Sequence, residues 1–544
     1  MPAQSSNAVQ LQQCQHCEAP EGPASFEEFS TWPKAIVQKL FARGDGNDDV
    51  RLNRVRSLCA GGLQVYSDYS GMAGEYEFLF QLGEALSPKV NFTVMHRRFC
   101  DISRVSQFIL KQIAQTEVDD EPCVMCDINS RLPKHALSWL DAAMPSPEDS
   151  AESSAASYRS MERYLMENRH TIFPNATTDW CVVHNRRCSL FPESCQPDDD
   201  QLQPLVMNFA GTTCRGWSSA GKSRHFSDPS ERPHAVWVTE RRYRAEELQE
   251  ALFFSECTPR YPVEVTVREK LQKPLEESHR VLSVILEPSM LGWPVRRKRM
   301  FSAGLSRAQV AWLGPDNGDD ILSDFLDFFK VSMKVDGGIF LVCTDEDVSV
   351  EERKMARARG HGFATSGAKL EKHQYLAPGQ LVRLENYEKI YAETGMTDQS
   401  FFADLDQNVT GASTAGSMIP SLLTHGTKYA LHAGRVVCPD ELYVSHGYNV
   451  VPLPKNSAAK SCRIKSFLKQ MPTNQRLHLL GNAWHLPVVS AWCLYVLSHC
   501  VWVNRNMTVQ PERSLLRKGG SRLCELDWDQ SPEKKRKETA DDNQ

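Results

Sequence analysis

The chain has 544 residues, of which 41% are hydrophobic and 24% charged, which is ordinary for a globular protein with room for two or three domains. Its formal net charge of −6 excludes a globally basic nucleic-acid coat, so contact with a polyanion would need a local basic patch such as residues 296–299. The 17 cysteines, together with a start that lacks the basic and apolar regions of a signal peptide, favour a reducing compartment with free thiols.

The first 60 residues are polar, and we expect residues 1–60 to form an N-terminal extension that is partly disordered. Cys14 and Cys17 form a single CxxC pair in this extension. Because a zinc site of this kind needs a second pair of ligands, we interpret the two residues as surface thiols.

A glycine loop between a predicted strand and a predicted helix begins the patterned part of the chain. Apolar residues from position 63 lead into residues 69–74, YSGMAG, and then recur at helical spacing. Glycine lets the backbone approach a ligand closely, and the start of a helix offers free N–H groups. Alone this loop is a weak sign of a ligand site, because many Rossmann-like sheets begin in this way.

Two aspartates end the next predicted strands. Asp101 follows the second apolar run and Asp127 the third. A carboxylate at the end of the second strand suits a ribose, because it accepts hydrogen bonds from two hydroxyls. An isolated aspartate after a strand is more often a turn or helix cap, but this series after a glycine loop favours a cofactor that contains a nucleoside.

Residues 134–200 interrupt the alternation of strands and helices and are interpreted as an insertion. Residues 145–157 are poor in apolar side chains and are expected to be a mobile loop, followed by a short helix over residues 158–166. Four soft metal ligands then lie close together, which allows a zinc site. Their spacing fits no standard zinc finger, so ordinary thiols are the preferred interpretation. The four are Cys181, His184, Cys188 and Cys195.

A single cysteine, Cys214, follows the apolar run that starts at residue 207, and a loop of glycine, serine and lysine comes after it. This pattern predicts a buried strand that brings the thiol to the edge of a sheet. A helix and a further apolar run lead to Glu256, and two more strands are predicted within residues 279–288 and 293–305.

Charged runs outside these segments have two interpretations each. Arg241, Arg242 and Arg244 are expected on a solvated face, with phosphate contacts as the alternative. The tail over residues 506–544 holds a basic run that is either a nuclear import signal or part of a solvated tail. This run consists of Lys534, Lys535, Arg536 and Lys537.

After residue 305 the alternating pattern of strands and helices is lost and then returns. Residues 306–415 lose the alternating pattern and are expected to form a separate lobe, whereas residues 416–505 recover it. Residues 484–503 are strongly apolar but contain two histidines and two serines, so we predict a buried helix and not a membrane span.

Taken in chain order, these segments resemble the motifs of the DNA (cytosine-5) methyltransferase family. Residues 69–74 are similar to the loop for the methionine part of S-adenosylmethionine, and residues 213–218 to the proline-cysteine-glutamine nucleophile loop. Residues 253–259 resemble the strand of the Glu-Asn-Val motif, and residues 292–299, GWPVRRKR, the GxPQxRxR motif. Residues 420–448 and 481–488 are similar to the ninth and tenth motifs of the family.

The resemblance implies an α/β fold: a Rossmann-like sheet of an S-adenosylmethionine-dependent methyltransferase with helices on both faces, plus a smaller mixed domain. The catalytic domain would cover residues 61–305, with the insertion at 134–200, and would resume at 416–505. The target-recognition domain would cover residues 306–415. The implied partner is double-stranded DNA. No membrane contact is expected, and the basic run at 534–537 gives the nucleus as the expected location, otherwise the cytoplasm or nucleoid.

The resemblance also implies a role for each motif residue. Cys214 would attack carbon 6 of a cytosine flipped out of the duplex, with Glu256 at the N3 edge and with Arg297 and Arg299 stabilising the charge on the ring. The cofactor would be S-adenosyl-L-methionine. Its implied contacts are Tyr69, Ser70, Gly71, Met72, Gly74, Asp101, Asp127, Asn482 and Trp484.

Several motif positions depart from the family pattern. Thr213 and Arg215 flank the cysteine in place of proline and glutamine, and Cys257 and Thr258 replace the Asn-Val that follows the glutamate. Two alternative functions therefore stay open. One is a catalytically silent, methyltransferase-like protein that binds DNA or serves as a scaffold, and the other is an RNA cytosine-5 methyltransferase.

Overall fold

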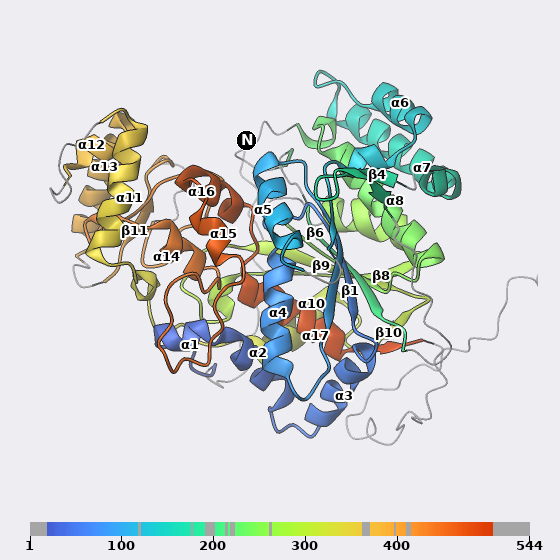
Figure 1. Cartoon of the computed structure of the whole chain (residues 1–544), viewed down its shortest axis with the longest axis horizontal. Coiled ribbons are helices and arrows are strands. Elements are labelled where there is room, and N and C mark those ends of the chain that lie inside the picture. The colour runs from blue at the N-terminus through green and yellow to red at the C-terminus, as the bar shows by residue number, and fades with distance from the viewer. Residues whose placement is uncertain are drawn as a thin grey trace, which may run out of the picture. The chain divides into compact units, whose positions relative to one another are not determined.

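A mixed sheet with strand order β5-β4-β3-β2-β1-β6-β7-β9-β8 is the centre of the fold (Figure 1). The computed structural model describes residues 19–117, 121–175, 178–190, 202–212, 216–217, 224–259, 264–361, 370–395, 399–409 and 415–503. The strands of this sheet are β1 (Leu63–Asp68), β2 (Val94–Cys100), β3 (Cys123–Met125), β4 (Thr178–Cys181), β5 (Arg186–Ser189), β6 (Leu205–Gly211), β7 (Leu252–Cys257), β8 (His279–Leu286) and β9 (Arg299–Ser306).

The direction of the strands identifies where a ligand would bind. Strands β3, β2, β1, β6 and β7 are parallel, whereas β9 pairs antiparallel with both β7 and β8. Strands β2 and β3 follow β1 outward on one side, and β6 and β7 lie on the other side, so the strand order reverses between β1 and β6. In doubly wound sheets, ligands bind in the crevice outside the carboxyl ends of the strands at this reversal.

Each face of the sheet carries its own hydrophobic core. In β7, Leu252 and Phe254 belong to one core and Phe253 to the other, as the alternation of side chains along a strand requires. The predicted class, an α/β sheet with helices on both faces, is confirmed. One core includes α2 (Trp32–Phe41), α3 (Asp48–Leu58), α4 (Gly74–Leu86), α5 (Arg104–Ala114), α10 (Gly318–Phe329) and α17 (Leu486–Ser498); the other includes α6 (Lys134–Ala143), α7 (Ala151–Asn175), α8 (Glu231–Glu247) and α9 (Lys273–Leu275).

The segment at 134–200 contributes to this architecture in a way the sequence did not reveal. Strands β4 and β5 extend the main sheet, and α7 packs against α8. The mobile loop expected over residues 145–157 is wrong from Ala151 onward, because α7 begins there. Ser150 caps this helix by accepting a hydrogen bond from the Ser153 N–H at 3.1 Å, and Ser154 and Tyr158 bury one face.

Residues before β1 are helical and belong to the main core. Helix α1 (Phe26–Ser30) and helices α2 and α3 bury Phe29, Trp32 and Leu40, among others. The indole Nε1–H of Trp32 donates to the carbonyl of Gly447 at 3.0 Å.

Near the end of the described residues, α17 is buried over its whole length, as predicted. Among the described residues, no helix is both long enough and apolar enough to cross a membrane.

A third, smaller core lies between α11 (Asp345–Ala358), α12 (Lys372–Tyr375), α13 (Pro378–Thr394) and the three-stranded sheet of β11 (Phe402–Asp404), β12 (Lys428–Ala430) and β13 (Arg435–Val436). Residues earlier in the expected lobe, including Phe325 and Phe340, pack into the main core instead. Strand β10 (Val310–Trp312) pairs with β14 (Cys500–Trp502). The small core therefore begins well after residue 306 and reaches Val436, and its role in target recognition stays a prediction.

The remaining short elements connect these layers. They are η1 (Ile128–Arg131), η2 (His225–Ser227), the π-helix η3 (Glu264–Gln272), η4 (Pro288–Met290), η5 (Gly337–Phe340), α14 (Pro439–Val444), α15 (Lys465–Lys469) and α16 (Thr473–Gly481).

Candidate active site

The glycine loop between β1 and α4 folds onto the end of β2. The N–H of Ser70 donates to the carbonyl of Cys100 at 3.0 Å, and the N–H of Cys100 donates to Oγ of Ser70 at 2.9 Å. The N–H of Gly71 donates to Oδ2 of Asp101 at 2.8 Å. Gly71 has φ +56°, a left-handed conformation that favours glycine. The structure thus brings together the two features that the sequence assigned to one cofactor.

Asp101 is placed to accept further hydrogen bonds. Its Oδ1 accepts from the N–H of Ser103 at 2.8 Å, and burial raises the pKa of the carboxyl although the backbone hydrogen bonds from Ser103 and Gly71 oppose this. A carboxylate has about four lone-pair sites, so these two N–H groups leave acceptor capacity for the two hydroxyls of a ribose. The free acceptor sites of Asp101 therefore fit the ribose of a nucleoside.

A cavity lies between the glycine loop and the segment before α17. Most residues predicted to contact the cofactor line it, although they come from segments far apart in the sequence. Trp484 closes one side, and its ring packs near Phe78 and Phe209. A Cβ added to Gly211 would lie 3.4 Å from Nε1 of Trp484. The lining residues are Ser67, Tyr69, Ser70, Met72, Gly74, Glu75, Gly211, Asn482, Ala483 and Trp484.

Four residues of this cavity were not predicted from the sequence: Ser67, Glu75, Gly211 and Ala483. Glu75 is the acidic residue among them. It directly follows Gly74 in the first turn of α4 and is buried. Burial raises the pKa of its carboxyl to about 7, although the hydroxyl of Ser67 lowers it. The sequence offers one feature that could have indicated Glu75: it is an acidic residue directly after the glycine loop. Its burial is known only from the structure.

Asp127 has a different environment from Asp101. Its Oδ1 accepts from the N–H of Asn129 at 2.9 Å and from the side-chain amide of Asn129 at 3.0 Å. Asp127 is therefore the N-cap of η1. Like Asp101 and Gly71, it is not among the residues that line the cavity, but unlike Asp101 it makes no hydrogen bond to the glycine loop. Its predicted contact with the cofactor stays a prediction.

The strand that leads to the predicted nucleophile ends beside Glu256. Strands β6 and β7 pair with Gly211 opposite Glu256. Both the N–H and the hydroxyl of Thr212 donate to the carbonyl of Glu256 at 3.1 Å. Cys214 follows two residues later and, together with Thr213 and Arg215, lies outside the described residues.

The two motif arginines have separate surroundings. Nε of Arg299 lies 2.8 Å from Oε1 of the nearly buried Glu256. Arg297 is also buried, but its guanidinium donates to the carbonyls of Leu422, Gly481 and Ala483. Arg299 thus faces the predicted active site, whereas Arg297 ties the cavity segment around Asn482 to the rest of the fold.

These groups gather at one edge of the sheet. The glycine loop follows β1, Asp101 follows β2, Thr212 follows β6, and Glu256 lies at the end of β7. All are at the carboxyl ends of parallel strands, on both sides of the point where the strand order reverses. This arrangement defines a doubly wound α/β protein whose candidate site lies at the reversal point, where such sheets bind their ligands.

Comparison with known proteins gives structural likenesses only. No family model matches the chain, and no curated protein matches it. It is similar over 80% of its length to the S. pombe Dnmt2 methyltransferase, at 13% identity and a TM-score of 0.37, covering 98% of that chain. It is also similar over 80% to the Entamoeba histolytica methyltransferase EhMeth, at 10% identity, a TM-score of 0.35 and 98% coverage. A mutant DNMT2 of Spodoptera frugiperda gives 10% identity, a TM-score of 0.34 and 99% coverage.

Proposed function

We propose that this protein is a divergent cytosine-5 methyltransferase that acts on DNA with S-adenosyl-L-methionine. The observation that carries the proposal is the bonding of Thr212 to Glu256 at the carboxyl edge of the sheet. It ties the start of the Cys214 loop to the carboxylate strand. The ion pair between Arg299 and Glu256 supports the same assignment.

The chemistry requires a nucleophile, an acid and an activated methyl group. We assign the nucleophile to the thiolate of Cys214, which adds to carbon 6 of cytosine and makes carbon 5 nucleophilic. We assign to Glu256 the role of general acid at the N3 edge of the ring, where negative charge develops during this addition. S-adenosyl-L-methionine, when bound, supplies an electrophilic methyl group to carbon 5. Water then accepts the carbon-5 proton, the 5,6 double bond re-forms, and the thiolate of Cys214 is expelled.

Arg299 and Arg297 take different parts in this proposal. Arg299 lies 2.8 Å from Glu256, so it is the arginine that holds the carboxylate and contributes positive charge beside the ring. Arg297 acts as a positioning residue, because its three carbonyl partners include Gly481 and Ala483 beside the cavity. This proposal narrows the sequence-based assignment, which gave the stabilising role to both Arg297 and Arg299.

The cofactor fits the residues around the cavity. Asp101 would hold the ribose hydroxyls, and the backbone of residues 69–74 would hold the methionine part together with Asn482 and Trp484. For the base itself, a stacked cytosine exposes neither face to a thiolate, so the target must be flipped out. We assign the reading of the duplex to the small core between α11 and β13.

A single-turnover assay with labelled S-adenosyl-L-methionine tests the proposal on a duplex that contains cytosine. Wild type should transfer label and form a covalent complex, whereas Cys214→Ser should do neither while still binding cofactor. Glu256→Gln should slow transfer by roughly 10²- to 10⁴-fold. Cys343→Ser changes a half-buried thiol in another part of the fold and should match wild type.

The two alternatives give different results in the same assay. The substitutions at Thr213, Arg215, Cys257 and Thr258 motivate the silent protein, for which duplex binding would persist without any transfer. Competition between duplex DNA and folded RNA tests the other alternative, an RNA cytosine-5 methyltransferase, because such an enzyme would transfer label to the RNA first.

We further infer a nuclear location from the basic run that ends in Lys537. A fluorescent reporter fused to residues 504–544 should enter the nucleus, and replacement of the four basic residues by alanine should leave it in the cytoplasm. Equal distribution of the two reporters would contradict the inference.

A further inference from the structure

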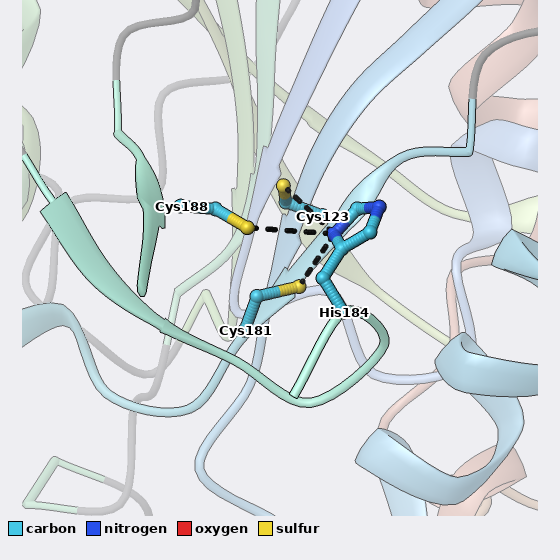
Figure 2. Close-up of side chains that lie close together, drawn as sticks. All are labelled: Cys123, Cys181, His184 and Cys188. Carbon is cyan, nitrogen blue, oxygen red and sulfur yellow. Dashed lines mark hydrogen bonds between the residues drawn. The ribbon is translucent and has the colours of Figure 1, made fainter. Parts of the chain in front are cut away.

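Three cysteines and one histidine, none of which lines the cavity, meet at the edge of the main sheet (Figure 2). Cys123 begins β3, Cys181 ends β4, His184 lies in the turn that follows, and Cys188 lies in β5. Their three sulfur atoms and one imidazole nitrogen all lie within 4.8 Å of one another. The sequence pointed to three of these residues, but Cys123 comes from a strand far earlier in the chain. Cys195, the expected fourth ligand, lies outside the described residues.

The distances agree with a tetrahedral metal site. Nδ1 of His184 lies 3.6 Å from Sγ of Cys123, 3.3 Å from Sγ of Cys181 and 3.5 Å from Sγ of Cys188. With Zn–S near 2.3 Å and Zn–N near 2.0 Å, sulfur and nitrogen ligands of a tetrahedral zinc lie roughly 3.5 Å apart. In Figure 2 the dashed lines from the three sulfurs converge on this one ring nitrogen.

Groups around the four residues support metal binding. Nε2 of His184 lies 3.5 Å from Oε2 of Glu121, the arrangement in which a carboxylate orients a metal-bound histidine. The N–H of Val124 donates to Sγ of Cys181 at 3.3 Å, which stabilises a thiolate. Asn185 has φ +50° and forms the tight turn between His184 and β5.

We propose that Cys123, Cys181, His184 and Cys188 bind one zinc ion that has a structural role. Three sulfurs and one imidazole are a standard ligand set for zinc, and four protein ligands leave no open position for catalysis. An ion would reinforce the β4–β5 hairpin, because within the described residues one ladder pair, Met125 with Cys181, joins it to β3 beside a hydrogen bond from the N–H of Val182 to the carbonyl of Val124. The ion would fix the hairpin to the strand that leads into Asp127 and η1.

A second cluster shows why the first is distinctive. Cys343, Cys438 and Glu441 also lie close together. The carboxylate of Glu441, however, pairs with Arg435 and accepts the backbone N–H groups of Cys343 and Cys438. Because these partners already use its oxygens, that cluster offers two thiols and no complete ligand set.

Metal analysis of the purified full-length chain, expressed with zinc in the medium, tests the proposal. Wild type should contain about one zinc per chain, and Cys123→Ser and Cys188→Ser should lose it. The matched control is Cys126→Ser, which removes a half-buried thiol just after β3 that does not belong to the cluster and should keep the zinc. Zinc contents in Cys123→Ser and Cys188→Ser equal to wild type would overturn the proposal.

Two further measurements guard against variants that fail to fold. Wild type stripped with a chelator should bind one Co²⁺ with the visible spectrum of tetrahedral thiolate coordination, and a spectrum of octahedral Co²⁺ would count against the site. His184→Cys should keep zinc through a fourth thiolate, whereas His184→Ala should lose it. If His184→Ala kept as much zinc as wild type, histidine would not be a ligand and the proposed set would be wrong.

Discussion

At the scale of single residues, Asp101 shows how one side chain serves both the loop and the ligand site. Its two oxygens accept N–H groups from Gly71 and Ser103, so the carboxylate fixes the glycine loop before any ligand arrives. Preorganisation of this kind reduces the entropy lost on binding. The hydrogen-bond acceptor sites that remain on the two oxygens are those we propose for the ribose hydroxyls.

Asp101→Asn should weaken binding of S-adenosyl-L-methionine by roughly 10- to 100-fold, because hydrogen bonds to a charged group contribute about 1.5–3 kcal/mol. Calorimetry on the full chain measures the affinity. Cys214→Ser is the control that should bind cofactor like wild type. Equal affinities in the two variants would contradict the assignment of Asp101.

Glu75 should make stability depend on pH. Burial raises the pKa of its carboxyl from the ordinary 4.5 to about 7. The folded state therefore holds more protons than the unfolded state between these values, and this residue's contribution to stability falls as pH rises from about 4.5 to about 7. Glu75→Gln removes the penalty, so its advantage over wild type should grow to at most roughly 3 kcal/mol at pH 8.

Urea unfolding at pH 5 and pH 8 measures this difference. Glu84→Gln is the matched control, since Glu84 lies on the exposed side of the same helix. A Glu75→Gln advantage of the same size at both pH values would show that the carboxyl does not titrate in this range.

At the scale of elements, α8 is held to the sheet by a buried network of charges. Asp68 at the end of β1 contacts Arg98, Arg131 and Arg241. Burial would raise the pKa of Asp68, but these three guanidinium groups hold it well below its usual range. Glu240 of α8 shares the same arginines, and burial is again outweighed, so its pKa falls to about 2.

The arginines of α8 were predicted on a solvated face, or in contact with phosphates, and for Arg241 and Arg244 this is wrong. Both are fully buried and pair with Glu250 at 2.8 Å and 2.9 Å. Helix α8 packs against α7, and its Trp237 contacts Asn208 of β6 and Phe253 of β7, so it has little free surface. Charged side chains on such a helix must find partners within the protein.

Arg241→Met should destabilise the protein by roughly 3–5 kcal/mol, because it leaves Asp68 and Glu250 buried with one partner fewer. Arg242→Met is a matched control on the same helix. Arg242 pairs with Glu246 and Glu277 near the surface, so its loss should cost about 1 kcal/mol or less. Urea midpoints with unchanged m-values measure both effects, and similar losses would argue against a buried network.

At the scale of the whole molecule, both ends of the described chain build one core. Helices α2 and α3 pack against α17, and Trp32 bonds to the carbonyl of Gly447. The segment before β1 was expected to be an extension. Its helices instead cover apolar surface that would otherwise face water.

A chain that begins at Gly61 should therefore fail to unfold cooperatively, because the apolar faces of α4 and α17 would be exposed. Differential scanning calorimetry tests this. Trp32→Phe is the milder variant, which keeps the ring but leaves the Gly447 carbonyl without its donor, and it should cost about 1–3 kcal/mol. A truncated chain with a normal transition would contradict the assignment of these helices to the core.

The sequence by itself determined seven strands of the main sheet, the residues that end them and a buried helix within residues 484–503; these strands are β1, β2, β3, β6, β7, β8 and β9. Apolar runs that stop at Asp101 or Glu256 are local patterns, and β-strands place such residues at the same edge of a parallel sheet. For this reason the sequence alone indicates the glycine loop, Asp101 and Glu256 as candidate site residues, and it predicts the fold class correctly.

Only the tertiary structure decided which partner each side chain meets. It separated Arg299 at Glu256 from Arg297 among backbone carbonyls, buried Arg241 and Arg244, and brought Cys123 to His184 across 61 residues of sequence. The physical reason is that a local pattern fixes the face on which a side chain lies. Pairing across the sheet, and burial between layers, depend on segments distant in the chain, and no local pattern records them.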